Sequence, residues 1–167
     1  WSSDVCSSDL FNMFGLSFSA VALGVARTCI DDFKALAQEK SPQAAGWAWV
    51  LRDNAVIQSK VAQAEAQWRG ARALVLEIYD ELQDKAVAGK PFDLRDRADM
   101  RLASTWAMNE AAKVVDIIYH AAGATAIFES NPFERRFRDI NTASQQGQAS
   151  QANFEVIGQV LLGVTPR

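Results

Sequence analysis

The segment between Ile57 and Leu82 constrains the fold most, because apolar side chains recur there at alternating steps of four and three. The members of this stripe are Ile57, Val61, Ala64, Trp68, Ala71, Val75, Ile78 and Leu82. A helical period places them all on one face, whereas the period of a strand would scatter them over two faces. The pattern predicts a helix of about 30 residues. It should begin after a cap at Asp53 or Asn54 and end before Gly89.

Two further long helices are predicted, over residues 15–40 and 94–122. Pro42 ends the first, because proline disfavours helix at the residue before it. Asp93 is the expected N-cap of the second, and Gly123 is its expected stop. The apolar stripe of the second helix consists of Leu94, Ala98, Leu102, Thr105, Met108, Ala112, Val115, Ile118 and Ala122.

A fourth helical region is expected over residues 132–162. Pro132 suits the first helical position, and a break is expected near Gly147. Residues 42–49 are predicted to form a loop whose two tryptophans are buried against neighbouring helices or a partner chain. Together these segments predict an all-α, up-and-down four-helix bundle. Helices of this length leave apolar surface uncovered, so we expect the chain to oligomerise through a helix face.

Composition excludes several kinds of function. The net charge of −3 argues against a nucleic-acid partner, since phosphate binding requires a basic face. Cys6 and Cys29 are too few for a disulfide framework, which favours a reducing, cytoplasmic location. With His120 as the one histidine, no metal site is expected. The apolar run 10–26 is interrupted by polar residues, so we interpret it as a core helix, and no membrane partner is expected.

The first ten residues are unusual for the start of a protein. They lack an initiator Met, and the sequence WSSDVCSSDL resembles translated sequencing-adapter DNA. The alternative is a polar N-terminal arm. We interpret residues 1–10 as non-native and residues 11–167 as one helical-bundle domain, and we expect the natural reading frame to continue upstream of Phe11.

Charged residues crowd the segment 123–139. The basic ones are Arg135, Arg136 and Arg138, and the acidic ones are Glu134 and Asp139. Two interpretations stay open: an ion-pair network that holds the segment to the bundle, or a border of the binding site for an anionic cofactor. His120 has a similar pair of interpretations, a contact with a nearby carbonyl or a contact with a ligand.

This segment also carries a resemblance to a known family. Gly123, the run Pro-Phe-Glu-Arg at 132–135 and the pair Arg138-Asp139 resemble the signature of the acyl-CoA dehydrogenase superfamily. That signature is a glycine-rich turn followed by Pro-x-Glu-Arg-x-x-Arg-Asp. The order of segments is similar to the family's C-terminal helical domain, from the Ala/Gly-rich opening helix (residues 20–27) to the last helix. The resemblance covers roughly residues 11–163.

The resemblance implies a flavin, FAD or FMN, held between this bundle and a β-domain that would precede it in a longer chain. It implies a homotetramer, in which the glycine turn reaches the flavin of a neighbouring subunit. Gly123, Ala124 and Thr125 would then face flavin.

Departures from the family pattern bear on the subclass. Many of the dehydrogenases have their catalytic glutamate at the position of Gly147, and glycine cannot remove a proton. Residues 138–146 resemble more closely the branch of reduced-flavin monooxygenases, which receive flavin from a partner reductase. Many members of that branch have a histidine where this chain has Gln146. Ser144 and Gln146 are the expected polar contacts of the flavin ring, and no catalytic residue is assigned.

Three hypotheses follow. The first is the C-terminal domain of a flavin-dependent monooxygenase that acts on a small aromatic or sulfur-containing substrate. The second is a genuine acyl-CoA dehydrogenase whose base lies elsewhere. The third is a helical assembly module without catalysis. Because most of a flavin site would lie on other domains, the 167 residues alone are expected to be inactive.

Overall fold

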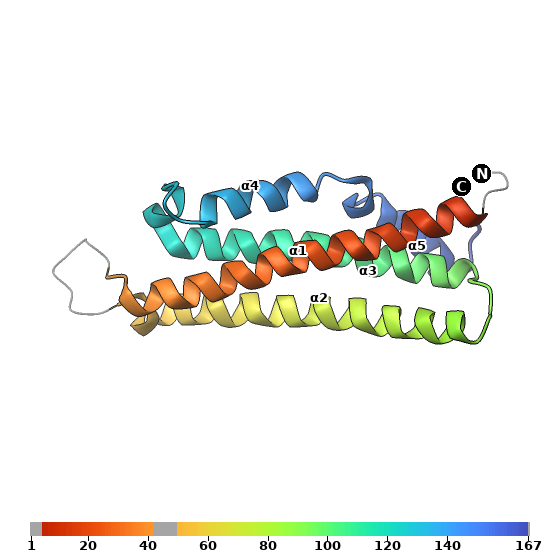
Figure 1. Ribbon diagram of the computed structural model, residues 1–167, viewed down its shortest axis with the longest axis horizontal. Coiled ribbons are helices and arrows are strands. Elements are labelled where there is room, and N and C mark those ends of the chain that lie inside the picture. The colour runs from red at the N-terminus through yellow and green to blue at the C-terminus, as the bar shows by residue number, and fades with distance from the viewer. Residues whose placement is uncertain (1–4, 42–49, 167) are drawn as a thin grey trace.

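The computed structural model describes residues 5–41 and 50–166, and this part of the chain is helical without a strand. Three long helices, α1, α2 and α3, run side by side, and the shorter α4 and α5 lie against them (Figure 1). The α-helices are α1 (Val5–Glu39), α2 (Ala55–Val87), α3 (Leu94–Ala122), α4 (Phe133–Ala143) and α5 (Asn153–Leu161). Short 3₁₀ turns are η1 (Leu51–Asp53), η2 (Gly123–Ile127) and η3 (Gly147–Ala149). The all-α bundle is therefore confirmed.

The first helix is longer than predicted. It begins at Val5, ten residues before the expected start at Gly15, and ends at Glu39. No proline interrupts residues 5–39, and Gly15 lies where α1 closely approaches Ser104 of α3. A glycine allows such a close approach without interrupting the helix, and α1 continues through this position. The predicted loop at 42–49, with its two tryptophans, lies outside the described residues.

The predicted stripe and cap of α2 are confirmed. Asn54, and not Asp53, is the N-cap, since its side-chain oxygen accepts hydrogen bonds from the amides of Val56 (2.8 Å) and Ile57 (3.2 Å). Every stripe residue is buried or half-buried. The end after Val87 includes Gly89 with a φ of +66°, which glycine adopts without a steric penalty.

The third helix is the centre of the bundle. Its bounds agree with the prediction, and Asp93 and Asp96 cap its start reciprocally. It contacts α1, α2, α4 and α5, so it is buried on more than the predicted stripe. Leu94 was wrongly included in that stripe, because it lies in the first turn and is 50% exposed.

The fourth helix of the predicted bundle is two helices. The predicted break near Gly147 is confirmed, since α4 ends at Ala143 and η3 occupies Gly147–Ala149 before α5 begins. Pro132 lies immediately before the first residue of α4 rather than within it. Because of this break, α4 covers the C-terminal half of α3 and α5 covers its N-terminal half (Figure 1).

The core lies between α1 and α3 and is closed by α2 and α4. Its largest fully buried side chains include Phe33, Ile118 and Phe133. Cys29 is also buried there, and burial raises the pKa of its thiol to about 12, so it stays protonated at neutral pH. By length and composition alone, the stretch Asn12–Glu39 of α1 could cross a membrane. In this bundle it supplies core residues instead.

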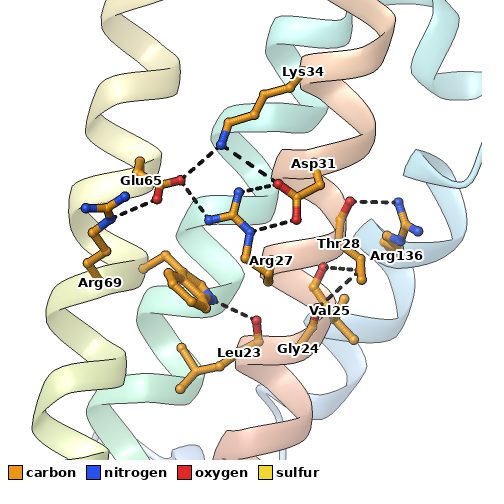
Figure 2. Close-up of polar contacts among 11 residues, drawn as sticks. Leu23, Gly24, Val25, Arg27, Thr28, Asp31, Lys34, Glu65, Arg69 and Arg136 are labelled. Carbon is orange, nitrogen blue, oxygen red and sulfur yellow. Dashed lines mark hydrogen bonds and ion pairs between the residues drawn. The ribbon is translucent and has the colours of Figure 1, made fainter.

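A charged network joins α1 to α2 beside the core (Figure 2). Arg27 donates hydrogen bonds to Asp31 on its own helix and to Glu65 on α2, the latter at 2.8 Å. Glu65 also accepts from Arg69 at 2.8 Å. The hydrogen bond from Arg27 is the main reason why the pKa of Glu65 falls to about 2. Trp68 completes the junction, because its indole nitrogen donates to the Leu23 carbonyl at 2.8 Å and its ring lies under Arg27.

Acidification is expected to weaken this junction. The pKa of Glu65 lies below its ordinary value of 4.5, so the charged network stabilises the fold fully above that pH. The contribution is lost as the pH falls through about 2, where the folded carboxylate takes up its proton. Because the network is partly open to water, we expect a loss of about 1 kcal/mol.

The measurement is urea denaturation above and within this pH window. Glu65→Gln should show a shallower loss of stability on acidification than the wild type. Glu77→Gln, which changes an exposed carboxylate on the same helix, is the control and should behave as the wild type. The same pH dependence in all three proteins would contradict the prediction.

Candidate functional site

The charged run after Pro132 forms helix α4 and is bound to the bundle from one side. Phe133 and Ile140 are buried beneath it. Arg136 forms an ion pair with Asp32 of α1. It also donates a hydrogen bond to the Thr28 carbonyl at 3.4 Å (Figure 2). The burial and the ion pair together fix the orientation of α4.

The ion pairs of the first interpretation are present, with Asp32 outside the segment as a further member. Arg135–Asp139 (3.5 Å) and Arg138–Glu134 (3.4 Å) are pairs within one helix face. Exposed pairs of this kind contribute little stability. The inter-helix contact of Arg136 is the one that places α4.

A shallow groove of about 700 Å³ runs along the outer side of α4 and the end of α3. Its lining residues are Tyr119, Glu134, Phe137, Arg138, Asn141, Thr142 and Gln145. Tyr119 and Phe137 stack at the groove with ring centroids 4.5 Å apart. The run 132–139 thus borders a concave surface, with aromatic faces and a guanidinium group at its edge.

A second hollow, of about 390 Å³, lies between α1 and α2. Phe33, Ala37, Ile57 and Val61 give it an apolar wall. None of the predicted site residues lines either concavity, but Glu134 and Arg138 of the charged run line the groove beside α4, which makes it the more relevant of the two.

The glycine turn lies at one end of α4. Gly123 and Ala124 are exposed, and Thr125 is half-buried. Lys40 of α1 reaches this turn and donates a hydrogen bond to the carbonyl of Ala122, the last residue of α3. A Cβ atom on Gly123 would lie 3.8 Å from the Lys40 ammonium nitrogen. The turn therefore combines an exposed backbone with a nearby cation, which suits an anionic group.

The predicted polar contacts lie at the other end of α4. Ser144 is half-buried, and its hydroxyl donates to the Asn141 carbonyl at 2.8 Å, so its proton is already used. The side chain of Gln146 is exposed. A Cβ atom on Gly147 would meet nothing within 4 Å, so the loop faces open space here.

The two predicted sets of site residues are not brought together. Helix α4, with 11 residues, lies between them in the chain, and it is about 16 Å long at the usual rise per residue. The turn at Gly123 and the loop at Gln146 therefore contact either distant parts of one ligand or two different ligands.

The histidine has the structural role that was one of its two interpretations. The His120 ring nitrogen Nδ1 lies 2.9 Å from the Asp116 carbonyl oxygen one turn earlier. Among the described residues no group of three potential metal ligands occurs.

Two groups of residues that contribute to the site were not predicted from the sequence. Lys40 is 82 positions from Ala122, and no spacing rule links them. Thr105 and Asn109 of α3 bind the loop that follows Ser144. Their spacing of four residues, which puts both on one helix face, was an available signal.

Residues 16–151 match the family described as acyl-CoA dehydrogenase, C-terminal domain. An indole-3-acetate monooxygenase of Acinetobacter baumannii is 31% identical over 148 residues, 89% of this chain and 38% of that protein. The oxygenase component of a p-hydroxyphenylacetate 3-hydroxylase from the same species is 26% identical over 89% of this chain and 34% of that protein. The chain thus spans little more than a third of the length of these relatives.

Known structures share the fold. XiaF from a Streptomyces species, in complex with FADH2 and glycerol, has a TM-score of 0.86 and 20% identity, covering 93% of this chain and 39% of that one. Butyryl-CoA dehydrogenase from Megasphaera elsdenii has a TM-score of 0.76 and 22% identity, covering 93% of this chain and 37% of that one.

Proposed function

The chain belongs to the acyl-CoA dehydrogenase C-terminal domain family, and from this premise we propose that it forms the helical wall of the flavin site in a longer, reduced-flavin-dependent monooxygenase. The observation that carries the proposal is the 31% identity to an indole-3-acetate monooxygenase over 89% of the chain. The remaining domains would supply most of the cofactor site.

The geometry at Gly147 favours a monooxygenase over a dehydrogenase. By resemblance, many dehydrogenases of the family have their catalytic glutamate at this position. Gly147 lies in an exposed loop that faces open space, where a carboxylate could reach a substrate. Glycine has no group to accept a proton, so this chain has no base at that place.

The two predicted sets of contact residues suit two different parts of a flavin. At one end of α4, the exposed turn at Gly123, Ala124 and Thr125 lies beside the Lys40 cation, which suits the phosphate of FAD or FMN. At the other end, the exposed Gln146 amide and the remaining acceptor capacity of Ser144 suit the polar edge of a flavin ring. Reduced flavin would supply the electrons that activate oxygen.

The distance between the two sets supports a homo-oligomer, a tetramer by resemblance, in which they contact flavins of different subunits. Exposed apolar side chains on α1, among them Phe14, Phe18 and Val21, offer surface for further domains or subunits. A separate reductase is proposed as the source of reduced flavin, and a small aromatic acid is the proposed substrate class.

Flavin binding by a lengthened chain tests the proposal. The β-domain proposed to precede the bundle is joined upstream of Phe11, and binding of FADH2 and FMNH2 is measured without oxygen. We expect one of them to bind, and Gln146→Ala to weaken binding by up to about tenfold, as for the loss of one hydrogen bond. Gln83→Ala, an exposed change on α2, is the matched control.

Two results would overturn the proposal. Binding of neither flavin would exclude the cofactor role. Reduction of bound oxidised flavin by an acyl-CoA thioester would identify a dehydrogenase instead.

A further inference from the structure

The loop between α4 and α5 is short and tightly turned. The amide of Ala149 donates to the Gln146 carbonyl at 2.9 Å, and the amide of Ser150 donates to the Gly147 carbonyl at 3.3 Å. These bonds define the turn η3, but they do not attach it to the bundle. Its carbonyl groups at 147, 148 and 149 are bound instead by side chains from other segments.

Helix α3 binds two of these carbonyls. The Thr105 hydroxyl donates to the Gln148 carbonyl at 2.7 Å, and the Asn109 side-chain amide donates to the Ala149 carbonyl at 2.8 Å. Thr105 is fully buried. Because the two residues are one helical turn apart, they form a short ladder that matches successive carbonyls of the loop.

The start of α5 closes the same network. The Asn153 side-chain amide donates to the Thr105 hydroxyl and to the Gly147 carbonyl, both at 3.0 Å. Gln151 donates to the side-chain oxygen of Asn109 at 2.7 Å. The Thr105 hydroxyl thus donates to one partner and accepts from another, so a single rotamer is fixed.

Helix α1 packs against the loop on a further side, beside the contacts with α3 and α5. A Cβ atom on Gly15 would lie 2.9 Å from the Ser104 hydroxyl oxygen and 3.4 Å from Cγ of Gln148. The loop therefore lies against α1, α3 and α5 with little freedom to shift, while Gln146, directly before it, stays exposed.

We propose that Thr105, Asn109 and Asn153 are positioning residues, which bind the backbone of residues 147–149 so that Gln146 is held toward the flavin ring. The role toward flavin rests on the proposed function. The immobilisation of the loop does not, because it follows from the contacts of this chain alone.

Amide hydrogen exchange of the 167-residue chain tests the immobilisation. Thr105→Val keeps the shape of the side chain but removes the hydroxyl, so the Gln148 carbonyl loses its shortest hydrogen bond and Asn153 loses one of its acceptors. We expect exchange at the amides of Ala149 and Ser150 to become about tenfold faster or more. Thr105→Ser, which keeps the hydroxyl, should restore slow exchange.

The control is Thr28→Val, since the Thr28 hydroxyl bonds only within α1 among the described contacts. Exchange at Val75 and Ile78 in α2 reports global stability and should change less than exchange in the loop. Equal acceleration in the loop and in α2 would show a general destabilisation and overturn the positioning role. So would unchanged exchange in the loop.

A double-mutant cycle in the lengthened protein tests the role toward flavin. If Thr105 acts through Gln146, Thr105→Val should weaken binding of reduced flavin in the wild type but not in the Gln146→Ala background. Additive effects would overturn this role. Absence of flavin binding in the wild type would overturn the proposed function together with it, while the exchange result would still decide whether the loop is held.

Discussion

Replacing Phe33 by alanine is expected to lower the free energy of unfolding by about 3–5 kcal/mol, the largest effect of any single change considered for this chain. The side chain is 0% exposed and lies in the core cluster that α1 shares with α3. Removal of the ring loses its transfer free energy and leaves a cavity that the two long helices cannot close without bending.

Urea denaturation measures this loss as a shift in the midpoint with an unchanged slope. Phe18→Ala is the matched control, because Phe18 lies on the same helix but is 45% exposed. Its effect should stay below about 1 kcal/mol. Similar losses for both variants would mean that α1 does not bury the face assigned to it.

The long helices could be predicted because the residues within each one specify its helical period and its ends. The stripe from Ile57 to Leu82 repeats often enough to exclude a strand, and Asp93 and Gly123 mark the ends of α3 by local chemistry that tertiary contacts do not change. The start of α1 was predicted ten residues too late, because residues 1–10 were interpreted as non-native and left out. Gly15 lies inside the helix, where its small size serves the contact with Ser104, a neighbour that sequence spacing does not show.

The position of the candidate site could be predicted only in part. The run 132–139, which was interpreted either as an ion-pair network or as the border of a binding site, lies beside a concave surface. Its orientation, however, depends on Arg136 and Asp32, which are 104 positions apart. The resemblance already placed the Gly123 turn at the flavin of a neighbouring subunit, and helix α4 lies between this turn and Gln146 in the chain.

Gly123→Ala is expected to lower the free energy of unfolding by about 1–3 kcal/mol. Gly123 ends α3 with φ +61° and ψ −148°, a combination that is essentially restricted to glycine. Its amide donates to the His120 carbonyl, so the turn cannot relax without loss of that bond. The cost arises from the backbone, since a Cβ atom here would meet no atom closer than the Lys40 nitrogen at 3.8 Å.

Gly24→Ala provides a control of opposite sign. Gly24 lies inside α1, is exposed, and a Cβ atom there would meet nothing within 4 Å. Alanine should therefore stabilise the helix by about 0.5–1 kcal/mol. Thermal or urea denaturation of both variants separates backbone strain from helix propensity, because the two changes add the same methyl group. If both variants were stabilised, the turn after α3 would not hold the strained conformation, and the exposed backbone beside Lys40 would lose its fixed geometry as a site for an anion.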